Sequence, residues 1–285
     1  MLKFLLRILI IVVIIIIIIV SIVTIGNIVF NRQVNADVAE MFANRTKIPP
    51  QIVTEKDLRG LPEPVQRWLL YSRVTGEEKI TTVRLKQDGF FRLKKDSKWL
   101  PFKAEEYFTV DPPAFIWYTT MNVAPFFFIK GRDRYFDGNG NILIKLWSLI
   151  TVAKASGDEI NQGTLVRFLN EMMWFPSAAL SDYITWVPID STSAEAKMSY
   201  MGNTASAIFH FNKQGAITNI TASRYMKRDG NFTLEKWSTP ISEYGEFNGI
   251  RIPIKGEGEW NLESGDFSYI KVNVKDVEYN NATVY

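Results

Sequence analysis

Charged side chains gather in one extended stretch of the sequence, GRDRYFDG at residues 131–138. On strand spacing, Arg132 and Arg134 point to one face, and Asp133 and Asp137 point to the other. The arginines can contact an anion or a lipid head group, and Asp133 can serve as a general base. An exposed strand face with cross-strand ion pairs explains the same pattern, so both interpretations stay open.

A second pair of charges, Arg167 and Glu171, stands four residues apart in a helical stretch. Such a pair on a helix surface is ordinary and contributes about 0.3–0.5 kcal/mol. With Asp133, Asp137 and Arg132, it defines one alternative function, an envelope hydrolase that uses Asp or Glu with Arg in a cleft. Acid–base catalysis by carboxylates requires a pocket and shifted pKa values. No sequence feature places a pocket around any two of these carboxylates, so the catalytic residues stay unassigned.

The usual catalytic signals are missing from this chain. The 285 residues include no Cys and one His, and they contain no G-x-S-x-G, P-loop, dinucleotide-binding or H-E-x-x-H motif. The single histidine, His210, alternates with Phe209 and Phe211, which indicates a strand residue rather than a catalytic one. Without Cys there can be no disulfide, thiolate zinc site or lipidated cysteine.

Asp137, Asn139 and Asn141 alternate like the first ligands of a calcium loop. The sixth position of such a loop is Ile142 here instead of Gly, and the twelfth is Ser148 instead of Glu. The run DGNG within this segment is typical of a tight β-hairpin, because these residues tolerate positive φ. We therefore predict no metal site and no cofactor.

Aromatic residues are numerous, with eight Trp and nineteen Phe. They form runs at 115–118, 126–128 and 174–175 that simple alternation does not bury. A strand that is apolar on both faces must be covered on both sides. Helices can cover one face, and the other needs a second layer, a bound apolar molecule or a membrane surface; a thick ordinary core is the alternative. The residues that we predict to bind an apolar ligand are Phe126, Phe128, Trp147, Met172, Trp174, Phe175, Arg132 and Arg167.

The N-terminal segment at residues 8–30 is almost wholly aliphatic. A helix of about 20 apolar residues crosses a hydrocarbon core of about 30 Å. A cleaved signal peptide has a shorter apolar region and a small-residue cleavage site, which residues 34–36 imitate poorly. Lys3 and Arg7 before the segment favour a cytoplasmic N-terminus. We predict a retained single-pass anchor in the cell membrane, with the main domain extracytoplasmic; cleavage of the segment stays the alternative.

Two helical patterns, at 61–72 and 158–174, interrupt a chain that otherwise has strand periodicity. From residue 81 onward, runs with a period of two alternate with Gly-, Asn- and Asp-rich turns, and Asp88 with Gly89 marks a bulge or turn. The run ILIKLWSLITVA fits either a strand or a helix. Serial hairpins with two inserted helices predict an α+β fold in which the helices lie on one face of an antiparallel sheet.

We divide the chain into a transmembrane anchor at 1–30, a stalk at 31–53 and an exterior β-rich domain at 54–285. Pro49 and Pro50 end any helical continuation of the anchor, because proline cannot donate to the helix ladder. The net charge is only +3 and no block of Lys or Arg occurs, so nucleic acid is excluded as a partner.

Several motifs resemble an uncharacterised bacterial family of membrane-anchored proteins, described only as a domain of unknown function. In chain order over residues 61–279, they are LPEPVQRWLLYSRVTG, LKQDGFFRL, WLPFKAEEYFTVDPPAFIW, IKGRDRYFDGNGN, LVRFLNEMMWFPSAAL and YGEFNGIRIPIKGEGEW. The pattern W-F-P-[ST]-A followed by aliphatic residues is the most specific. The resemblance implies a bacterial envelope protein and supplies no activity.

More loosely, serial strands with inserted helices resemble the half-barrel of periplasmic lipoprotein carriers of the LolA and LppX type. That resemblance implies that a curved antiparallel sheet follows the transmembrane helix, with helices on its concave face and an apolar cavity between them. The helix at 158–174 then fills the concave side. Trp174 and Phe175 anchor it there, and Pro176 turns the chain out to the rim.

Our leading hypothesis is a non-enzymatic, membrane-anchored envelope protein that binds or carries an apolar ligand such as a lipid or acyl chain. The envelope hydrolase described above is one alternative. A scaffold whose exposed aromatic residues bind another membrane protein is the other. No sequence feature identifies a protein partner or an oligomeric state.

Overall fold

One antiparallel sheet organises the residues that this computed structural model describes, 1–228 and 230–285. Its strand order is β6-β5-β4-β3-β2-β1-β14-β13-β11-β10-β9-β8-β7, and β12 pairs with β13 beside this path. The strands are β1 (Thr82–Phe91), β2 (Leu100–Thr109), β3 (Ala114–Ala124), β4 (Phe127–Phe136), β5 (Asn139–Leu146), β6 (Ile150–Ala155), β7 (Ile184–Asp190), β8 (Ser193–Tyr200), β9 (Asn203–Phe211), β10 (Ile217–Arg228), β11 (Asn231–Ser238), β12 (Ile241–Phe247), β13 (Ile250–Asn261) and β14 (Phe267–Tyr279). The helices are α1 (Leu2–Ala43), α2 (Glu63–Tyr71), α3 (Asp158–Glu171) and the 3-10 helices η1 (Met172–Trp174) and η2 (Pro176–Leu180).

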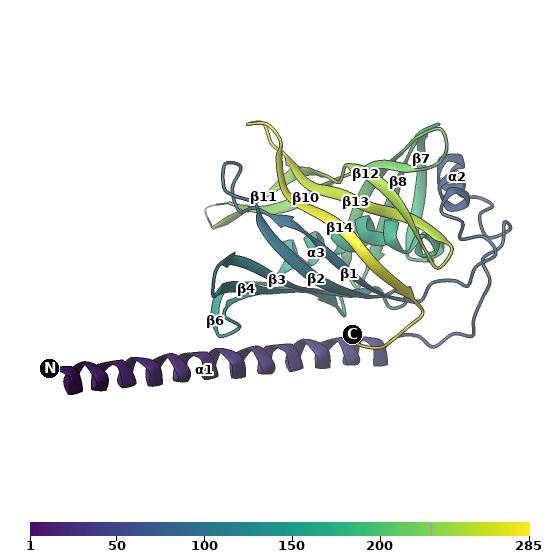
Figure 1. Cartoon of the computed structure of the whole chain (residues 1–285). Helices are drawn as coiled ribbons and strands as arrows, with labels where there is room; N and C mark the ends of the chain where they lie inside the picture. Colours follow the sequence, from purple (N-terminus) through teal and green to yellow (C-terminus); the bar gives the residue numbers. More distant parts are fainter. Residues whose placement is uncertain (229) are drawn as a thin grey trace.

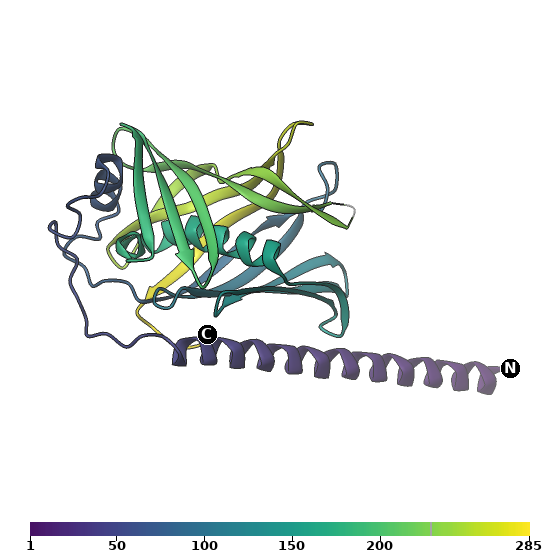
Figure 2. The same ribbon diagram turned by 180° about the vertical axis from the view of Figure 1, so that it is seen from behind.

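The sheet curls into a half-barrel whose concave side holds α3, while α1 runs along the outside (Figure 1). Figure 2, the view from behind, shows β8 and β9 on one side of α3 and β1 and β14 on the other. Helix α3 contacts β4, β5, β9 and β10. The expected fold class, an α+β domain in which a curved antiparallel sheet packs a helix on its concave face, is confirmed.

Alternation along each strand decides which side chains enter the half-barrel. In β4, Gly131 and Asp133 line the interior. Lys130 and Arg132 face outward and contact α1, where Lys130 Nζ donates to Asn31 Oδ1 across 2.8 Å. The inward and outward side chains of β4 therefore contact two different layers of the molecule.

The hairpin between β4 and β5 confirms the turn predicted from DGNG. Asp137 and Gly138 have φ values of 48° and 74°, which suit a tight two-residue hairpin. The run ILIKLWSLITVA forms β5 and β6 rather than a helix. At Gly89 the strand β1 continues, and a Cβ there would lie 1.9 Å from the Lys271 carbonyl oxygen. Glycine is needed there because two strands approach closely.

The WFP sequence follows α3 and fixes it inside the half-barrel. Trp174 Nε1 donates to the Pro253 carbonyl oxygen across 3.1 Å. The Phe175 ring is fully buried, with its centroid 4.7 Å from that of Phe108. The anchoring expected of these two aromatics is confirmed. The expectation for Pro176 is wrong: it begins the buried helix η2 instead of leading to the rim, because proline suits the first turn of a helix.

Helix α1 is continuous from Leu2 to Ala43, and it is long and apolar enough to cross a membrane. Its C-terminal part lies against the outside of β2 and β3, where Phe30, Val34 and Val38 are buried. Arg132 forms an ion pair with Asp37 at this contact. The division into anchor and stalk at residue 30 stays a prediction; within the helix, no break marks it.

Candidate functional site

A cavity of about 590 Å³ lies between α3 and the concave face of the sheet. This volume is within the range of about 300–1,000 Å³ that small-molecule sites occupy. The wall is mostly apolar and includes Met121, Ile144, Met173, Trp174, Met226, Trp237, Trp260 and Val274. The helix that fills the concave side therefore leaves room beside it for an apolar molecule.

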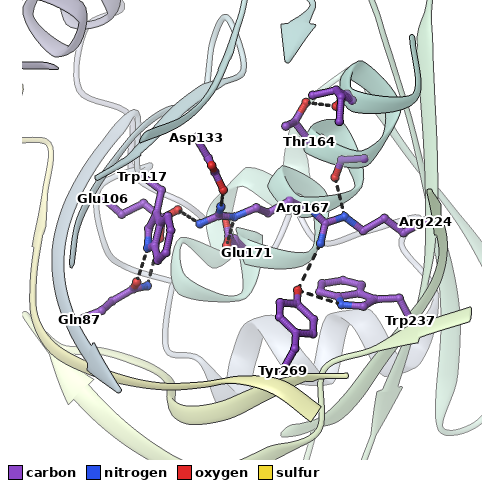
Figure 3. Close-up of polar contacts among 12 residues, drawn as sticks. Gln87, Glu106, Trp117, Asp133, Thr164, Arg167, Glu171, Arg224, Trp237 and Tyr269 are labelled. Carbon is purple, nitrogen blue, oxygen red and sulfur yellow. Dashed lines mark hydrogen bonds and ion pairs between the residues drawn. The ribbon is translucent and has the colours of Figure 1, made fainter. Parts of the chain in front are cut away.

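Arg167, on α3, holds three carboxylates together at the cavity wall (Figure 3). Its Nη2 donates to Glu106 Oε1 across 2.7 Å, and its Nη1 donates to Asp133 Oδ2 across 2.8 Å. Its Nε donates to Glu171 Oε1 across 2.6 Å. The expectation that Arg167 and Glu171 form an ordinary surface pair is wrong, because the half-barrel encloses α3 on both of its sides.

Glu106 is fully buried and is held by a short chain of hydrogen bonds. The indole of Trp117 donates to Gln87 Oε1 across 3.0 Å, and Gln87 Nε2 donates to Glu106 Oε2 across 3.0 Å. An indole N–H can only donate, so it fixes the orientation of the Gln87 amide. The Arg167 guanidinium also lies 4.9 Å from the ring centroids of Phe115 and Trp117. These contacts hold the charged group rigidly.

Burial sets the electrostatics of this cluster. It raises the pKa of Glu106 well above the ordinary value, and the neighbouring Glu171 carboxylate adds to that rise. Burial also raises the pKa of Asp133 and Glu171, although Arg167 opposes the shift in both. The arrangement is that of a coupled group of acids around one cation, and Glu171 Oε2 is buried without a hydrogen-bond partner among the described residues.

A second arginine, Arg224 on β10, enters the cavity from the opposite wall (Figure 3). Its Nε donates to the Gly163 carbonyl oxygen across 3.0 Å, and its Nη1 donates to the Tyr269 hydroxyl across 3.3 Å. The guanidinium lies 5.2 Å from the Trp237 ring centroid. Within the described residues, no carboxylate lies within 4.0 Å of it, so its charge is available to an anionic group.

The predicted ligand-binding residues occupy three different places. Trp174 and Arg167 line the cavity. Met172 and Phe175 are fully buried in the core behind it. Arg132 lies on the outer face of β4 and pairs with Asp37 of α1, so it does not join the cavity.

The other three predicted residues lie away from the cavity wall, at one end of the sheet. Phe126 is in the turn between β3 and β4, and Trp147 is in the turn between β5 and β6. Phe128 alternates with Ile129 on β4 and lies on the face opposite the cavity. Of the predicted hydrolase residues, Asp133, Glu171 and Arg167 converge, whereas Asp137 sits in the β4–β5 turn.

Glu106 was missed, although the sequence holds a signal for it. Phe102, Ala104, Glu106 and Phe108 share one face of β2 on strand spacing, so a charge interrupts an apolar face. An ionisable group in that position requires a buried partner. Arg224 carries the same kind of signal, because on strand spacing it shares a face of β10 with Ile220, Ala222 and Met226.

Comparisons with known proteins agree with the expected family. A crystal structure of a LolA superfamily protein from Nitrosomonas europaea shares 8% sequence identity over 70% of this chain and 87% of that chain, with a TM-score of 0.37. A likeness at that score carries no argument about function. No curated protein matches the chain. The sequence profile described as a family of unknown function, DUF6544, matches residues 51–272, which is most of the chain and includes the WFP motif. The chain therefore belongs to this family of unknown function, DUF6544.

Proposed function

We propose that this chain is a membrane-anchored protein of the cell envelope that holds an apolar chain, such as the acyl chain of a lipid, in its cavity. The observation that carries the proposal is the mostly apolar cavity of about 590 Å³ beside α3. A cavity wall of Trp, Met and Ile gains most from contact with hydrocarbon, since removing apolar surface from water contributes about 25 cal/mol per Å².

The charges at the cavity wall restrict what the ligand presents there. Arg167 is already surrounded by Glu106, Asp133 and Glu171. An anionic head group beside Arg167 therefore meets three acids and gains little. Of the two arginines, Arg224 is therefore the one at which an anionic group gains a partner.

Helix α1 supports a retained anchor. Cleavage near residues 34–36 removes Phe30 and Val34, whose side chains are buried against the domain. The aliphatic part that precedes Phe30 is exposed and needs a lipid environment. Lys3 and Arg7 precede it, which favours a cytoplasmic N-terminus and an extracytoplasmic domain.

Photo-crosslinking in cells tests the proposal. Ile144 lines the cavity, whereas its neighbour Leu143 faces α1 on the outside of β5. A photoreactive amino acid at Ile144 should yield a lipid adduct by mass spectrometry, and the same group at Leu143 should crosslink to α1. If Ile144 crosslinks only to other parts of the chain, the cavity holds no lipid in cells.

One observation favours a second function, an envelope hydrolase. Asp133 and Glu171 line the cavity and converge with the buried Glu106, and burial raises the pKa of all three carboxyl groups, as is common for catalytic acids. If the chain is a hydrolase, the adduct at Ile144 should have the mass of the product in the unchanged protein and the mass of the substrate in Glu171→Gln. A carrier predicts the same adduct in both proteins.

A further inference from the structure

An exposed apolar patch lies at one end of the sheet, on two neighbouring turns. Phe126 and Phe127, at the β3–β4 turn, are 94% and 47% exposed. Ile150, at the β5–β6 turn, is 54% exposed, and Leu149 beside it is also exposed. Isolated apolar residues on a surface need no explanation, but a contiguous group of large ones marks an interaction site.

The two turns are joined into one rigid unit. Trp147 Nε1 donates to the Phe126 carbonyl oxygen across 2.8 Å, and its ring centroid lies 5.1 Å from that of Phe127. The backbone of Trp147 also donates to the Phe128 carbonyl oxygen across 3.1 Å. The structure thus holds the aromatic side chains outward instead of letting them fold back into the sheet.

Helix α1 fixes the position of this unit relative to the apolar segment. Leu149 lies against Gly26, where an added Cβ would be 2.2 Å from Leu149 Cδ2. Ser148 Oγ and Asn27 Oδ1 form a hydrogen bond of 3.3 Å, and Lys145 Nζ lies 5.0 Å from the Phe30 ring centroid. The turns therefore lie beside the last part of the aliphatic segment at 8–30. Because α1 continues to Ala43, this position is near the middle of the whole helix, where Figure 1 shows β6.

The length of the aliphatic segment sets the depth at which the two turns meet the membrane. Residues 8–30 rise about 33 Å as a helix, which matches the hydrocarbon thickness, and Gly26 lies about 6 Å before the end of that run. With residues 8–30 in a bilayer, the two turns sit at its outer surface. Exposed Ile22, Ile25 and Val29 of α1 continue the same apolar surface beside Leu149.

The cavity opens at this end. Leu93, after β1, and Val152, on β6, both line the cavity and are both exposed. Exposed Lys94, Lys95 and Lys98 stand in the neighbouring β1–β2 connection, where they suit the anionic head groups of lipids.

On the basis of the proposed function, we propose that the β3–β4 and β5–β6 turns insert into the outer leaflet of the membrane that anchors the chain. The cavity mouth then faces the bilayer, and an acyl chain enters the cavity without crossing water. The partner of this patch is the lipid surface itself.

Depth-dependent fluorescence quenching of the full chain tests the inference. The protein has no Cys, so Phe126→Cys and Ile150→Cys each give one site for an environment-sensitive label. Met201 is 63% exposed and packs beside Gly138, at the opposite end of β4 and about 30 Å from Phe127, so Met201→Cys is the matched control. The chain is reconstituted in vesicles of phosphatidylethanolamine and phosphatidylglycerol that carry a nitroxide quencher near the head group.

The labels at positions 126 and 150 should lose most of their fluorescence, and the label at 201 should keep it. The inference is overturned if the quencher leaves the fluorescence of all three labels unchanged. It is also overturned if the quencher lowers the fluorescence at 201 as much as at 126. A protein crosslinked at 126 in cells, in place of quenching, also overturns it and favours the scaffold function. The lipid adduct at Ile144 is a separate readout, so the cavity function can stand while this inference fails.

Discussion

Arg167 on α3 and Glu106 on β2 form an ion pair of 2.7 Å in which Glu106 is completely buried. The pair links the enclosed helix to the middle of the curled sheet. Asp133 and Glu171 share the same guanidinium, so one cation serves three acids.

Arg167→Met should unfold the protein more easily than Glu106→Gln does. The Met variant leaves three buried acids without their cation, and breaking a buried pair in this way costs about 3–5 kcal/mol. The Gln variant removes one of the excess negative charges and keeps the shape, so a loss of less than about 1.5 kcal/mol is expected. Urea unfolding of the full chain in mild detergent measures both.

The control for that comparison is Arg73→Met. Arg73 pairs with Glu246 at the surface, where both side chains are about half exposed, and such a pair contributes less than about 1 kcal/mol. If Arg73→Met lowered the free energy of unfolding as much as Arg167→Met does, burial would not determine the cost of breaking an ion pair.

Stability should fall as the pH rises above the ordinary range of carboxyl groups. Burial raises the pKa of Glu106, Asp133 and Glu171 in the folded state, so the folded chain binds more protons than the unfolded chain. The stabilisation from these three carboxyl groups is complete below the unfolded pKa values, about 3.9 for Asp and about 4.3 for Glu. It is lost as the pH rises through their higher pKa values in the folded state. Thermal unfolding between pH 4 and pH 8 measures the decline.

Glu106→Gln should flatten that pH dependence, because it removes one of the raised groups. Glu246→Gln at the surface serves as the matched control and should leave the curve unchanged. A wild-type stability that rises with pH across the same range would contradict the sign of the shifts.

Cavity filling should reduce lipid binding without unfolding the helix. Gly163 on α3 lines the cavity, and an added Cβ there would lie 3.6 Å from Arg224 Nε, an ordinary contact. Gly163→Ala should therefore bind lipid normally and gain up to about 1 kcal/mol in helix stability. Gly163→Leu extends into the cavity and should lower the yield of the lipid adduct at Ile144 severalfold. Equal yields in the two variants would show that the ligand lies elsewhere.

Arg224→Gln should separate anionic from neutral ligands. Because Arg224 has no carboxylate within 4.0 Å among the described residues, an anionic head group gains a charged hydrogen bond there, worth about 1.5–3 kcal/mol. The variant should bind a fatty acid about tenfold more weakly and the fatty alcohol of equal length unchanged. Displacement of a fluorescent fatty-acid probe gives both affinities. Equal losses for the two ligands would indicate a structural role for Arg224.

Local patterns predicted the sheet because alternation and turn chemistry act over a few residues. The hairpin at Asp137 and Gly138 and the anchoring by Trp174 both follow from such patterns. The position of Arg167 does not, since helical spacing places it on a polar face and says nothing of what covers that face. Only the closure of the half-barrel over α3 turns this face into the wall of a cavity.

Pairs formed across long stretches of chain were equally inaccessible to sequence reasoning. Arg132 was expected to contact a ligand, yet it pairs with Asp37, which lies 95 positions earlier on α1. Asp37 has unremarkable neighbours in the sequence, and the charged run around Arg132 does not indicate a partner on α1. What brings them together is the docking of α1 on the outside of β2, β3 and β4, which depends on the curl of the whole sheet.

The unbroken course of α1 limits how far a carrier of the proposed kind can move its ligand. The same helix that carries the aliphatic residues also packs Phe30, Val34 and Val38 against the domain. While that contact holds, the irregular segment at 44–62 adds no reach. In the proposed function, a domain docked in this way stays at a fixed height above the membrane that holds α1. Delivery to a distant membrane then requires a mobile recipient that comes to the cavity mouth and collects the ligand there.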